Sequence, residues 1–493
     1  MDNNDLRLIL NTNAALVVIE TYDEARTIDL LKAEFADLGL PAWRWSVSEG
    51  LGPLGFGLEL AHPEQYSDPL VALRYIKEYR ARGAFVLCDI HPFLDEAKVV
   101  RMLKDVALNY SQCPQRVVLV SHALKLPPEL ARYAVSTEIS LPNDEEILAL
   151  VREQARTWAE ENGQSRIKTD NQTLQKLVSN LRGLTHRDVK RLAYGAIADD
   201  GAITESDLPE ITRAKFNLMD MEGVLHFEYS TAHLKEVAGL NRLKSWLDDR
   251  AHAMHSSAST NPLDPPRGVL LFGVQGGGKS LAAKAIAGVW GLPLLRLDMA
   301  ALFNKFIGET ERNLREALKL ADLMSPCVLW LDEIEKGMAQ GNDDSGTPKR
   351  LLGTLLTWMA ERKSRVFMVA TSNDISQLPP ELMRKGRFDE IFFVDLPDES
   401  VRESIFNIHL HKRSLNIADF NLPMLAVMTE GYTGAEIEQA IVSATYTAAA
   451  RQSPVNDTLL RDAIRQTQPL SVVMAEKIQA LRAWAEERAV RAN

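Results

Sequence analysis

The sequence predicts an α/β protein built on a parallel sheet that carries a phosphate-binding loop. Three observations support this prediction. The apolar run GVLLF leads into GVQGGGKS, residues 273–280, which fits G-x-x-x-x-G-K-S/T and precedes the apolar helical pattern LAAKAIAGVW. The run VLWLDE, residues 328–333, is typical of a strand buried on both faces of a parallel sheet. Segments of the first 210 residues also recur in the second half of the chain at a constant spacing.

The loop at residues 273–280 has the composition that phosphate binding requires. Its glycines lack a Cβ, so the backbone N–H groups can curl around phosphate oxygens. Lys279 adds a full positive charge where the next helix begins, and the dipole of that helix also favours an anion. The hydroxyl of Ser280 can bind Mg²⁺. The loop therefore predicts a nucleoside triphosphate site, formed by Gly273, Val274, Gln275, Gly276, Gly277, Gly278, Lys279, Ser280 and Leu281.

Acidic and amide side chains follow the next two predicted strands. Asp332 and Glu333 come at the C-terminal end of VLWLDE, which is the edge where ligands of parallel sheets bind. We expect Asp332 to hold Mg²⁺ through water, and Glu333 to orient and deprotonate the attacking water. The strand RVFMVATSND contains Asn373, whose amide can position that water or the γ-phosphate. Taken alone, Asn373 fits the opening of a turn equally well.

Two arginines, Arg384 and Arg387, follow a proline-rich turn in LPPELMRKGRFDE, residues 378–390. A guanidinium offered to a γ-phosphate stabilises the charge of the transition state, an effect of about 10³–10⁵ in rate. For these residues in isolation, a surface ion-pair cluster with nearby acidic residues is the better explanation. Their order after the loop, the acidic strand and Asn373 favours a catalytic role instead.

In combination, these motifs resemble the classical AAA branch of the AAA+ ATPases over about residues 230–450. The loop has Gln275 where most members have proline, and it looks closest to AAA proteins encoded by a hypothetical reading frame of some chloroplast genomes, with relatives in cyanobacteria and other bacteria. The resemblance implies a parallel sheet sandwiched by helices, a helical lid, and ATP and Mg as cofactors. EVAGLNRLKSWL, residues 236–247, and GYTGAEIEQA, residues 431–440, resemble the segments that enclose the nucleotide. They add Val237, Ala238, Gly239, Gly434 and Ala435 to the expected site.

The resemblance further implies a homo-oligomeric ring, usually a hexamer, in which Arg384 and Arg387 act on a neighbour's nucleotide as arginine fingers. It also implies a pore loop in NKFIGE, where Phe306, flanked by Lys305 and Ile307, would grip a protein substrate. The alternative for Phe306 is a core position in a short helix. The sequence contains no H-E-x-x-H motif, which excludes the zinc-protease version of this machine.

The first 210 residues are predicted to form a second AAA-like module. GLP occurs at 39–41 and 291–293, and LPPEL at 126–130 and 378–382, both at an offset of 252 residues. At this offset the predicted strand LVVIE, residues 16–20, falls on residues 268–272. GLTHRDVKRLA from residue 183 likewise mirrors GYTGAEIEQAI from residue 431. The alternative is an unrelated α/β domain whose matches are accidental.

This first module is predicted to be catalytically silent. Asp89, in FVLCDI, looks like the retained acidic residue of the acid strand, and no second arginine follows Arg132. The remaining functional positions carry other side chains: Thr27 for Lys279, Ile28 for Ser280, Ile90 for Glu333 and Ser121 for Asn373.

Composition narrows the class of protein. The chain has 493 residues, too many for one hydrophobic core, and a net charge of −11, which argues against a large nucleic-acid surface. The three cysteines lack metal spacing and indicate a reduced compartment. His409 and His411 lack further ligands nearby, so a solvated lid helix is favoured over a metal site. With no signal-peptide pattern and no long apolar run, we expect a cytoplasmic protein without a membrane span.

The expected organisation is a silent AAA-like domain at 1–210, a linker at 211–235, a large ATPase subdomain at 236–397, a helical lid at 398–470 and a C-terminal helix at 471–493. Three functional classes stay open. The first is a ring-forming ATPase that remodels an unidentified protein or complex. The second is a slow ATPase switch or assembly scaffold with nucleotide-dependent docking. The third is a DNA-linked loader, against which the acidic composition counts.

Overall fold

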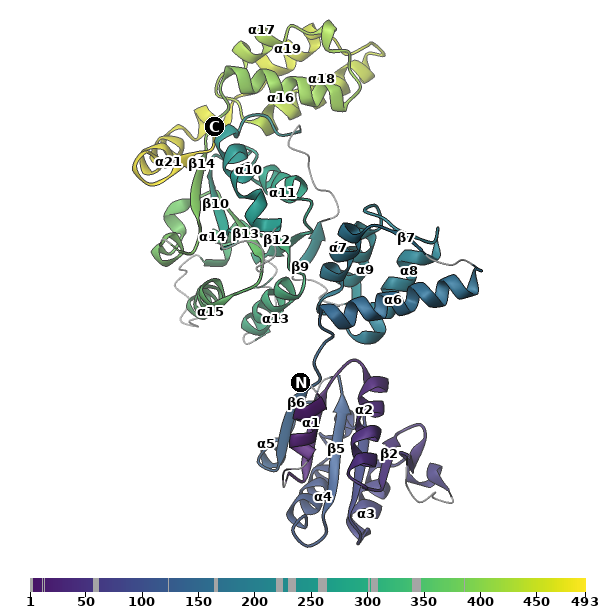
Figure 1. The fold of residues 1–493 in the computed structure, drawn as a ribbon. Coiled ribbons are helices and arrows are strands. Elements are labelled where there is room, and N and C mark those ends of the chain that lie inside the picture. The colour runs from purple at the N-terminus through teal and green to yellow at the C-terminus, as the bar shows by residue number, and fades with distance from the viewer. Residues whose placement is uncertain are drawn as a thin grey trace. The chain divides into compact units, whose positions relative to one another are not determined.

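The structure is a computed structural model that describes residues 3–493 except 11, 13, 56–61, 123, 164–166, 219–224, 229–235, 256–263, 300–301, 303–308, 339–346 and 385. The chain divides into two compact units, Met1–Asp207 and Leu208–Asn493 (Figure 1). Among the described helices, none is both long and apolar enough to cross a membrane.

The second unit is built on a seven-stranded sheet in the order β15-β14-β10-β13-β12-β11-β9. All neighbouring strands pair in parallel except β9, which runs antiparallel to β11 at one edge. The strands are β9 (Leu225–Glu228), β10 (Gly268–Gly273), β11 (Leu294–Asp298), β12 (Cys327–Asp332), β13 (Val366–Ser372), β14 (Glu390–Val394) and β15 (Val490–Arg491). The predicted strands before the loop, at the acidic residues and before Asn373 are therefore β10, β12 and β13.

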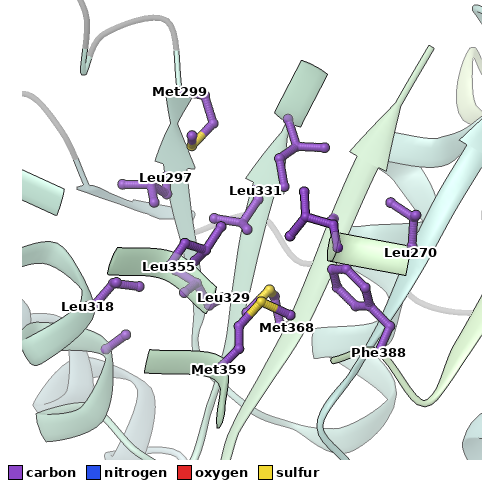
Figure 2. Close-up of a cluster of buried hydrophobic side chains, with 14 of the residues drawn as sticks. Leu270, Leu297, Met299, Leu318, Leu329, Leu331, Leu355, Met359, Met368 and Phe388 are labelled. Carbon is purple, nitrogen blue, oxygen red and sulfur yellow. The ribbon is translucent and has the colours of Figure 1, made fainter. Parts of the chain in front are cut away.

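Helices cover both faces of this sheet, because successive side chains of its buried strands point to opposite faces. Val269 and Leu271 of β10 pack toward α10 (Asn241–His255) and α11 (Lys279–Trp290). Leu270 and Phe272 join the opposite cluster, with α13 (Glu309–Leu323), α15 (Thr347–Glu361) and α21 (Ala475–Arg488). Figure 2 shows that second cluster, with Met359 near Met368 between helix and sheet. The predicted sandwich is confirmed.

A helical subdomain follows the sheet, as the resemblance implied. It consists of α16 (Glu399–Lys412), α17 (Leu422–Met428), α18 (Gly434–Ala450) and α19 (Asp457–Arg465), with the short α20 (Leu470–Val473) after them (Figure 1). Its own apolar core includes Phe406, Leu425 and Ile441. Thr433 and Glu436 form a capping box at the start of α18, which fixes the end of the helix that faces the phosphate-binding loop.

The first unit contains a six-stranded sheet in the order β3-β2-β4-β5-β1-β6. Its strands are β1 (Leu16–Glu20), β2 (Ala42–Ser46), β3 (Gly50–Pro53), β4 (Gly83–Cys88), β5 (Gln115–Ser121) and β6 (Ala134–Glu138). Helices α1 (Asn3–Leu10) and α2 (Glu24–Asp37) pack on one face, and α3 (Pro69–Glu78) and α4 (Ala97–Leu108) on the other. Helices α6 (Asp144–Glu161), α7 (Asn171–Leu181) and α8 (His186–Ala198) follow the sheet.

The two sheets share the order of five parallel strands. In each, the first of these strands lies between the fourth and the fifth, and one antiparallel strand lies at the far edge. This places β6, β1, β5, β4, β2 and β3 in the positions of β14, β10, β13, β12, β11 and β9. The predicted N-terminal AAA-like module is confirmed by this shared order.

The constant offset of 252 residues holds for β1 and β10 and for β2 and β11, but it is wrong for β4 and β12 and for β5 and β13. Strand β4 ends at Cys88 and β12 at Asp332, and the residue after each, Asp89 and Glu333, has a positive φ of 50° and 48°. Asp89 therefore takes the place of Glu333, not of Asp332. Strands β5 and β13 both end in serine, so that His122, and not Ser121, takes the place of Asn373. Pairing within the sheet sets these positions, whereas the loops between strands differ in length.

The segment predicted as a linker contains regular structure. Helix α9 (Leu208–Leu218) extends into it, and β9 within it adds the antiparallel edge strand to the second sheet. In the same way, the C-terminal region predicted as a helix contains α21 and then β15, which pairs with β14 at the other edge.

Candidate nucleotide-binding site

A cleft of about 750 Å³ lies at the carboxyl ends of β10, β12 and β13. The loop after β10 forms its floor, and residues of the lid helices α16 and α18 form part of its wall. Of the residues predicted from the sequence, those that line the cleft are Val237, Ala238, Gly239, Gln275, Gly276, Gly277, Gly278, Lys279, Ser280, Leu281, Asp332, Glu333, Asn373, Gly434 and Ala435. Strands far apart in the sequence meet here because parallel strands end at the same edge of the sheet.

Glycine is required at two points of the loop. Gly273 has a φ of 146°, and a Cβ added to it would lie 2.0 Å from the carbonyl oxygen of Val394. Gly278 has a φ of 95° and is the N-cap of α11, a conformation that residues with a Cβ adopt at a cost. These backbone requirements shape the loop so that α11 begins with its N-terminus at the cleft.

Lys279 is buried at the base of the loop, with 6% of its surface exposed. Its Nζ donates hydrogen bonds to the carbonyl oxygens of Gly273 and Val274, each at 2.9 Å. Burial lowers the pKa of Lys279 to about 8, although Glu335, Asp332 and Glu333 act in the opposite direction. A buried ammonium held by carbonyl oxygens is a cation that a phosphate group can satisfy better than the protein alone does.

The two predicted acidic residues have different partners. Asp332 accepts a hydrogen bond from Thr371 Oγ1 at 2.8 Å on one oxygen, and from Arg296 Nη2 at 2.9 Å on the other. Glu333 accepts a bond from the amide of Asn373 at 3.0 Å. The structure thus brings Glu333 and Asn373 together, as two side chains that can share one water molecule.

Glu333 has a left-handed backbone conformation, with a φ of 48°. A non-glycine residue with positive φ is uncommon, and such strain occurs most often at functional sites. Lys336 forms an ion pair with the same carboxylate, and the backbone N–H of Asn373 donates to Glu335 at 2.9 Å. These contacts hold the ends of β12 and β13 in a fixed relation to each other.

The lid reaches the loop directly. The backbone N–H of Ala435 donates to the carbonyl oxygen of Gly276 at 3.4 Å. His409 of α16 also lines the cleft, with only 18% of its side chain exposed and its Nδ1 3.4 Å from Glu438. Burial lowers the pKa of His409, although Glu438 raises it. His409 is thus mostly buried at the wall of the cleft, whereas His411 of the same helix is exposed.

Comparisons with known proteins agree with this geometry. The sequence model described as "ATPase family associated with various cellular activities (AAA)" matches residues 269–396, and an AAA+ lid domain matches 419–459. The AAA domain-containing protein ycf46 of Guillardia theta, itself uncharacterised, is 34% identical over 495 residues, which cover 99% of this chain and 95% of that protein. The ycf46 protein of Pyropia yezoensis is 33% identical over 489 residues, with 98% and 97% covered.

The chain belongs to the AAA ATPase family.

More distant relatives match a smaller part of the chain. The proteasome-activating nucleotidase of Aeropyrum pernix is 38% identical over 200 residues, which cover 39% of this chain and 48% of that protein. The first unit matches separate models, the N-terminal domain of SpoVK-like AAA ATPases at residues 2–139 and their second domain at 145–222. Both halves of this AAA ATPase are thus similar to parts of AAA proteins.

Four other predicted residues of this AAA ATPase do not line the cleft. Gly273 and Val274 shape the loop and hold Lys279 without lining the cavity. Arg384 is exposed, and Arg387 is half-buried and donates to the carbonyl oxygen of Leu356. Neither arginine is among the residues that line the cleft. The predicted pore-loop residues Lys305, Phe306 and Ile307 lie outside the described residues.

Several residues at the AAA ATPase site were not predicted. Arg296 holds Asp332 and also lies 5.0 Å from the Trp330 ring, but a single arginine in a strand gives no sequence signal. Residues 491–493 line the cleft from the far end of the chain, because β15 pairs with β14 beside the loop. Asn493 donates to Asp398 at 3.1 Å, which ties this segment to the start of α16.

The pKa of Lys279 predicts how nucleotide affinity depends on pH. Below about pH 8 the amine is charged and can pair with phosphate, whereas above it the free protein has a neutral amine. A nucleotide phosphate stays fully ionised across this range, since its second pKa is about 6. We expect the dissociation constant of a fluorescent ATP analogue to rise about tenfold from pH 7 to pH 9.

A matched control distinguishes the contribution of Lys279 to this pH dependence from that of Lys244. Burial also lowers the pKa of Lys244, whose Nζ donates a hydrogen bond to the carbonyl oxygen of Val237. Lys244→Arg keeps a charge at that position at all of these pH values. The variant should show the same pH dependence as the wild type. A flat affinity profile in the wild type, or a flat profile in Lys244→Arg, would contradict the assignment to Lys279.

Proposed function

We propose that this AAA ATPase works as a homo-oligomeric ring, with six subunits as the expected number, that hydrolyses Mg–ATP to remodel a protein or protein complex. The proposal that the protein hydrolyses ATP rests on the 3.0 Å hydrogen bond between Glu333 and Asn373. Both residues lie at the same edge of the sheet as Lys279. A carboxylate and an amide that lie this close together can hold one water molecule beside a bound phosphate, and the carboxylate can deprotonate it.

Each group in the cleft has a proposed task. Lys279 and the loop N–H groups bind the phosphates, and Glu333 acts as the general base with Asn373 orienting the water. Ser280 and Asp332 supply oxygen atoms of the kind that Mg²⁺ prefers. Both oxygens of Asp332 already accept hydrogen bonds, which favours contact with the ion through water. Bound Mg²⁺ would neutralise charge that develops on the phosphates.

The N-terminal AAA-like module is proposed to be catalytically silent. Thr27, which stands in place of the loop lysine, is fully buried and donates its hydroxyl to the carbonyl oxygen of Asp23 at 2.8 Å. Asp23 is the N-cap of α2, and its carboxylate accepts from the N–H of Arg26. A carboxylate therefore occupies the helix end where a phosphate would have to bind, and it would repel one.

Arg384 and Arg387 are proposed to act on the nucleotide of a neighbouring subunit. Their absence from the lining of the cleft in their own subunit supports this role. An interface in which one subunit's arginines reach the next subunit's nucleotide joins two different surfaces and is therefore heterologous. Such an interface forms a closed ring when the rotation that relates neighbouring subunits returns to the first subunit. Within this ring, Phe306 is proposed to grip a protein substrate. A cytoplasmic location also stays a prediction.

The second candidate is a nucleotide-dependent switch or assembly scaffold. It is favoured by the presence of a whole N-terminal unit that lacks a phosphate-binding loop and is therefore available for docking. The two candidates differ in what they require of Phe306, because a switch needs no residue that pulls on a substrate.

Phe306→Ala is expected to keep ATPase activity while abolishing the turnover of a partner captured with the Glu333→Gln variant, because the aromatic ring would no longer grip the polypeptide. ATPase rate and partner release are measured on the same preparation. Phe306→Tyr retains an aromatic ring and should behave as the wild type. Unchanged partner turnover in Phe306→Ala would support the switch.

Lys279→Ala is expected to abolish nucleotide binding, whereas Glu333→Gln should bind ATP normally and hydrolyse it about 10²–10⁴-fold more slowly, the range for a general base. Calorimetry gives the stoichiometry and a phosphate-release assay the rate. Lys284→Ala, on the same helix but paired with Glu228, is the matched control and should bind normally. Wild-type hydrolysis by Glu333→Gln would exclude it as the base. Residual binding in Lys279→Ala would contradict a silent N-terminal module.

Hydrolysis is expected to require assembly, so that specific activity rises with protein concentration. Mixing the Arg384→Ala/Arg387→Ala variant with Lys279→Ala should restore activity, because some intact loops then meet intact arginines. The loss to be rescued is about 10³–10⁵-fold. In the matched control, the arginine variant also carries Lys279→Ala, and no activity should return. Activity that is independent of concentration, with no rescue, would overturn the ring.

A further inference from the structure

Three side chains with metal-binding chemistry converge in the N-terminal AAA-like module. Asp89 and His91 follow β4, and His122 follows β5. One potential ligand atom from each residue lies within 4.8 Å of the others. Strands β4 and β5 are parallel neighbours, so their carboxyl ends bring the three residues to the same edge of the sheet. This is the edge at which open parallel sheets bind their ligands.

The backbone presents these residues as it presents the catalytic pair of the ATPase cleft. Asp89 has a φ of 50°, close to the 48° of Glu333, and follows the equivalent strand. His122 occupies the position of Asn373, directly after the equivalent neighbouring strand. The first unit has thus kept the conformation that aims a carboxylate at the ligand edge, although the chemistry beside it has changed from an amide to two imidazoles.

Ser121 fixes how two of the three residues are oriented. Its hydroxyl lies 2.9 Å from Asp89 Oδ1 and 2.8 Å from His91 Nδ1. An ionised carboxylate only accepts hydrogen bonds, so the hydroxyl donates its one hydrogen to Asp89 and accepts from Nδ1–H of His91. In the neutral ring, Nε2 then carries the free lone pair. Metal-binding histidines are commonly oriented in this way, through a bond made by their other nitrogen.

None of the three side chains is buried. The side chain of Asp89 is 57% exposed and that of His91 is 29% exposed. The rings of His91 and His122 lie edge to face, with centroids 4.9 Å apart, and the centroid of the Tyr22 ring lies 5.8 Å from that of His122. An ion held here would keep at least one position open to water or to an anionic ligand.

We propose that Asp89, His91 and His122 bind one divalent first-row transition cation, with Zn²⁺ as the probe. Two imidazoles and one carboxylate suit Zn²⁺, Fe²⁺ or Co²⁺, whereas Mg²⁺ and Ca²⁺ prefer a shell made of oxygen atoms. The site lies where the equivalent ATPase edge holds its catalytic residues, and Asp23 closes the phosphate position beside it. The silent module is therefore a metal-binding module and not merely a degenerate one.

The test measures Zn²⁺ binding to the full-length, tag-free chain by equilibrium dialysis and elemental analysis, with Co²⁺ absorption as a second readout. The wild type should bind one more equivalent than Asp89→Asn or His122→Ala. Loss of a group that only hydrogen-bonds a ligand already costs about 10–100-fold in affinity, so each ligand variant should lose at least that much. A large excess of Mg²⁺ should not displace the ion.

His62→Ala is the matched control, since it removes an exposed histidine of the same unit, 3.8 Å from Glu64 and outside the cluster. It should bind as the wild type does. Asn tolerates the left-handed backbone at residue 89, and His122 is exposed, so both ligand variants should fold, and either one alone decides the test. Equal Zn²⁺ binding by the wild type and a folded ligand variant, or an equal loss in His62→Ala, would overturn the proposal.

Discussion

The parallel pairing of β10, β13 and β12 is the constraint on which the rest of the ATPase unit depends. Gly268 pairs with Met368, and Leu331 with Ala370, so the three strands end at one edge although long segments separate them in the chain. The loop with Lys279, the carboxylate of Glu333 and the amide of Asn373 then converge without any local sequence signal for their contact. A shift in this register by one residue would turn their side chains to the opposite face.

The electrostatics of the cleft follow from that convergence. Burial of Lys279 disfavours its charged form, and three carboxylates near it only partly offset this effect, so its pKa stays at about 8. The loop therefore holds a cation whose desolvation is incompletely compensated by the protein. A bound phosphate completes the compensation, which is why the same burial that weakens the lysine in the free protein favours an anion in the cleft.

The two units show that one sheet topology can present different chemistry at the same edge. Five parallel strands have the same order in both, and both place a non-glycine residue with positive φ after the equivalent strand. In the second unit this residue is Glu333, beside an amide and a buried lysine. In the first it is Asp89, beside His91 and His122, with Thr27 in place of the lysine. The backbone sets where ligands bind, and the side chains decide which ligands these are.

The sequence by itself determined the phosphate-binding loop, the acidic strand, Asn373 and the presence of a second AAA-like module, because glycines and apolar runs constrain the backbone locally and short segments recur along the chain. Only the tertiary structure decided that Arg296 holds Asp332, that His409 lines the cleft and that residues 491–493 reach it. It also moved Asp89 into the place of Glu333 and His122 into that of Asn373. These facts depend on pairing between distant segments, and loops of unequal length shift such pairing out of any constant spacing in the sequence.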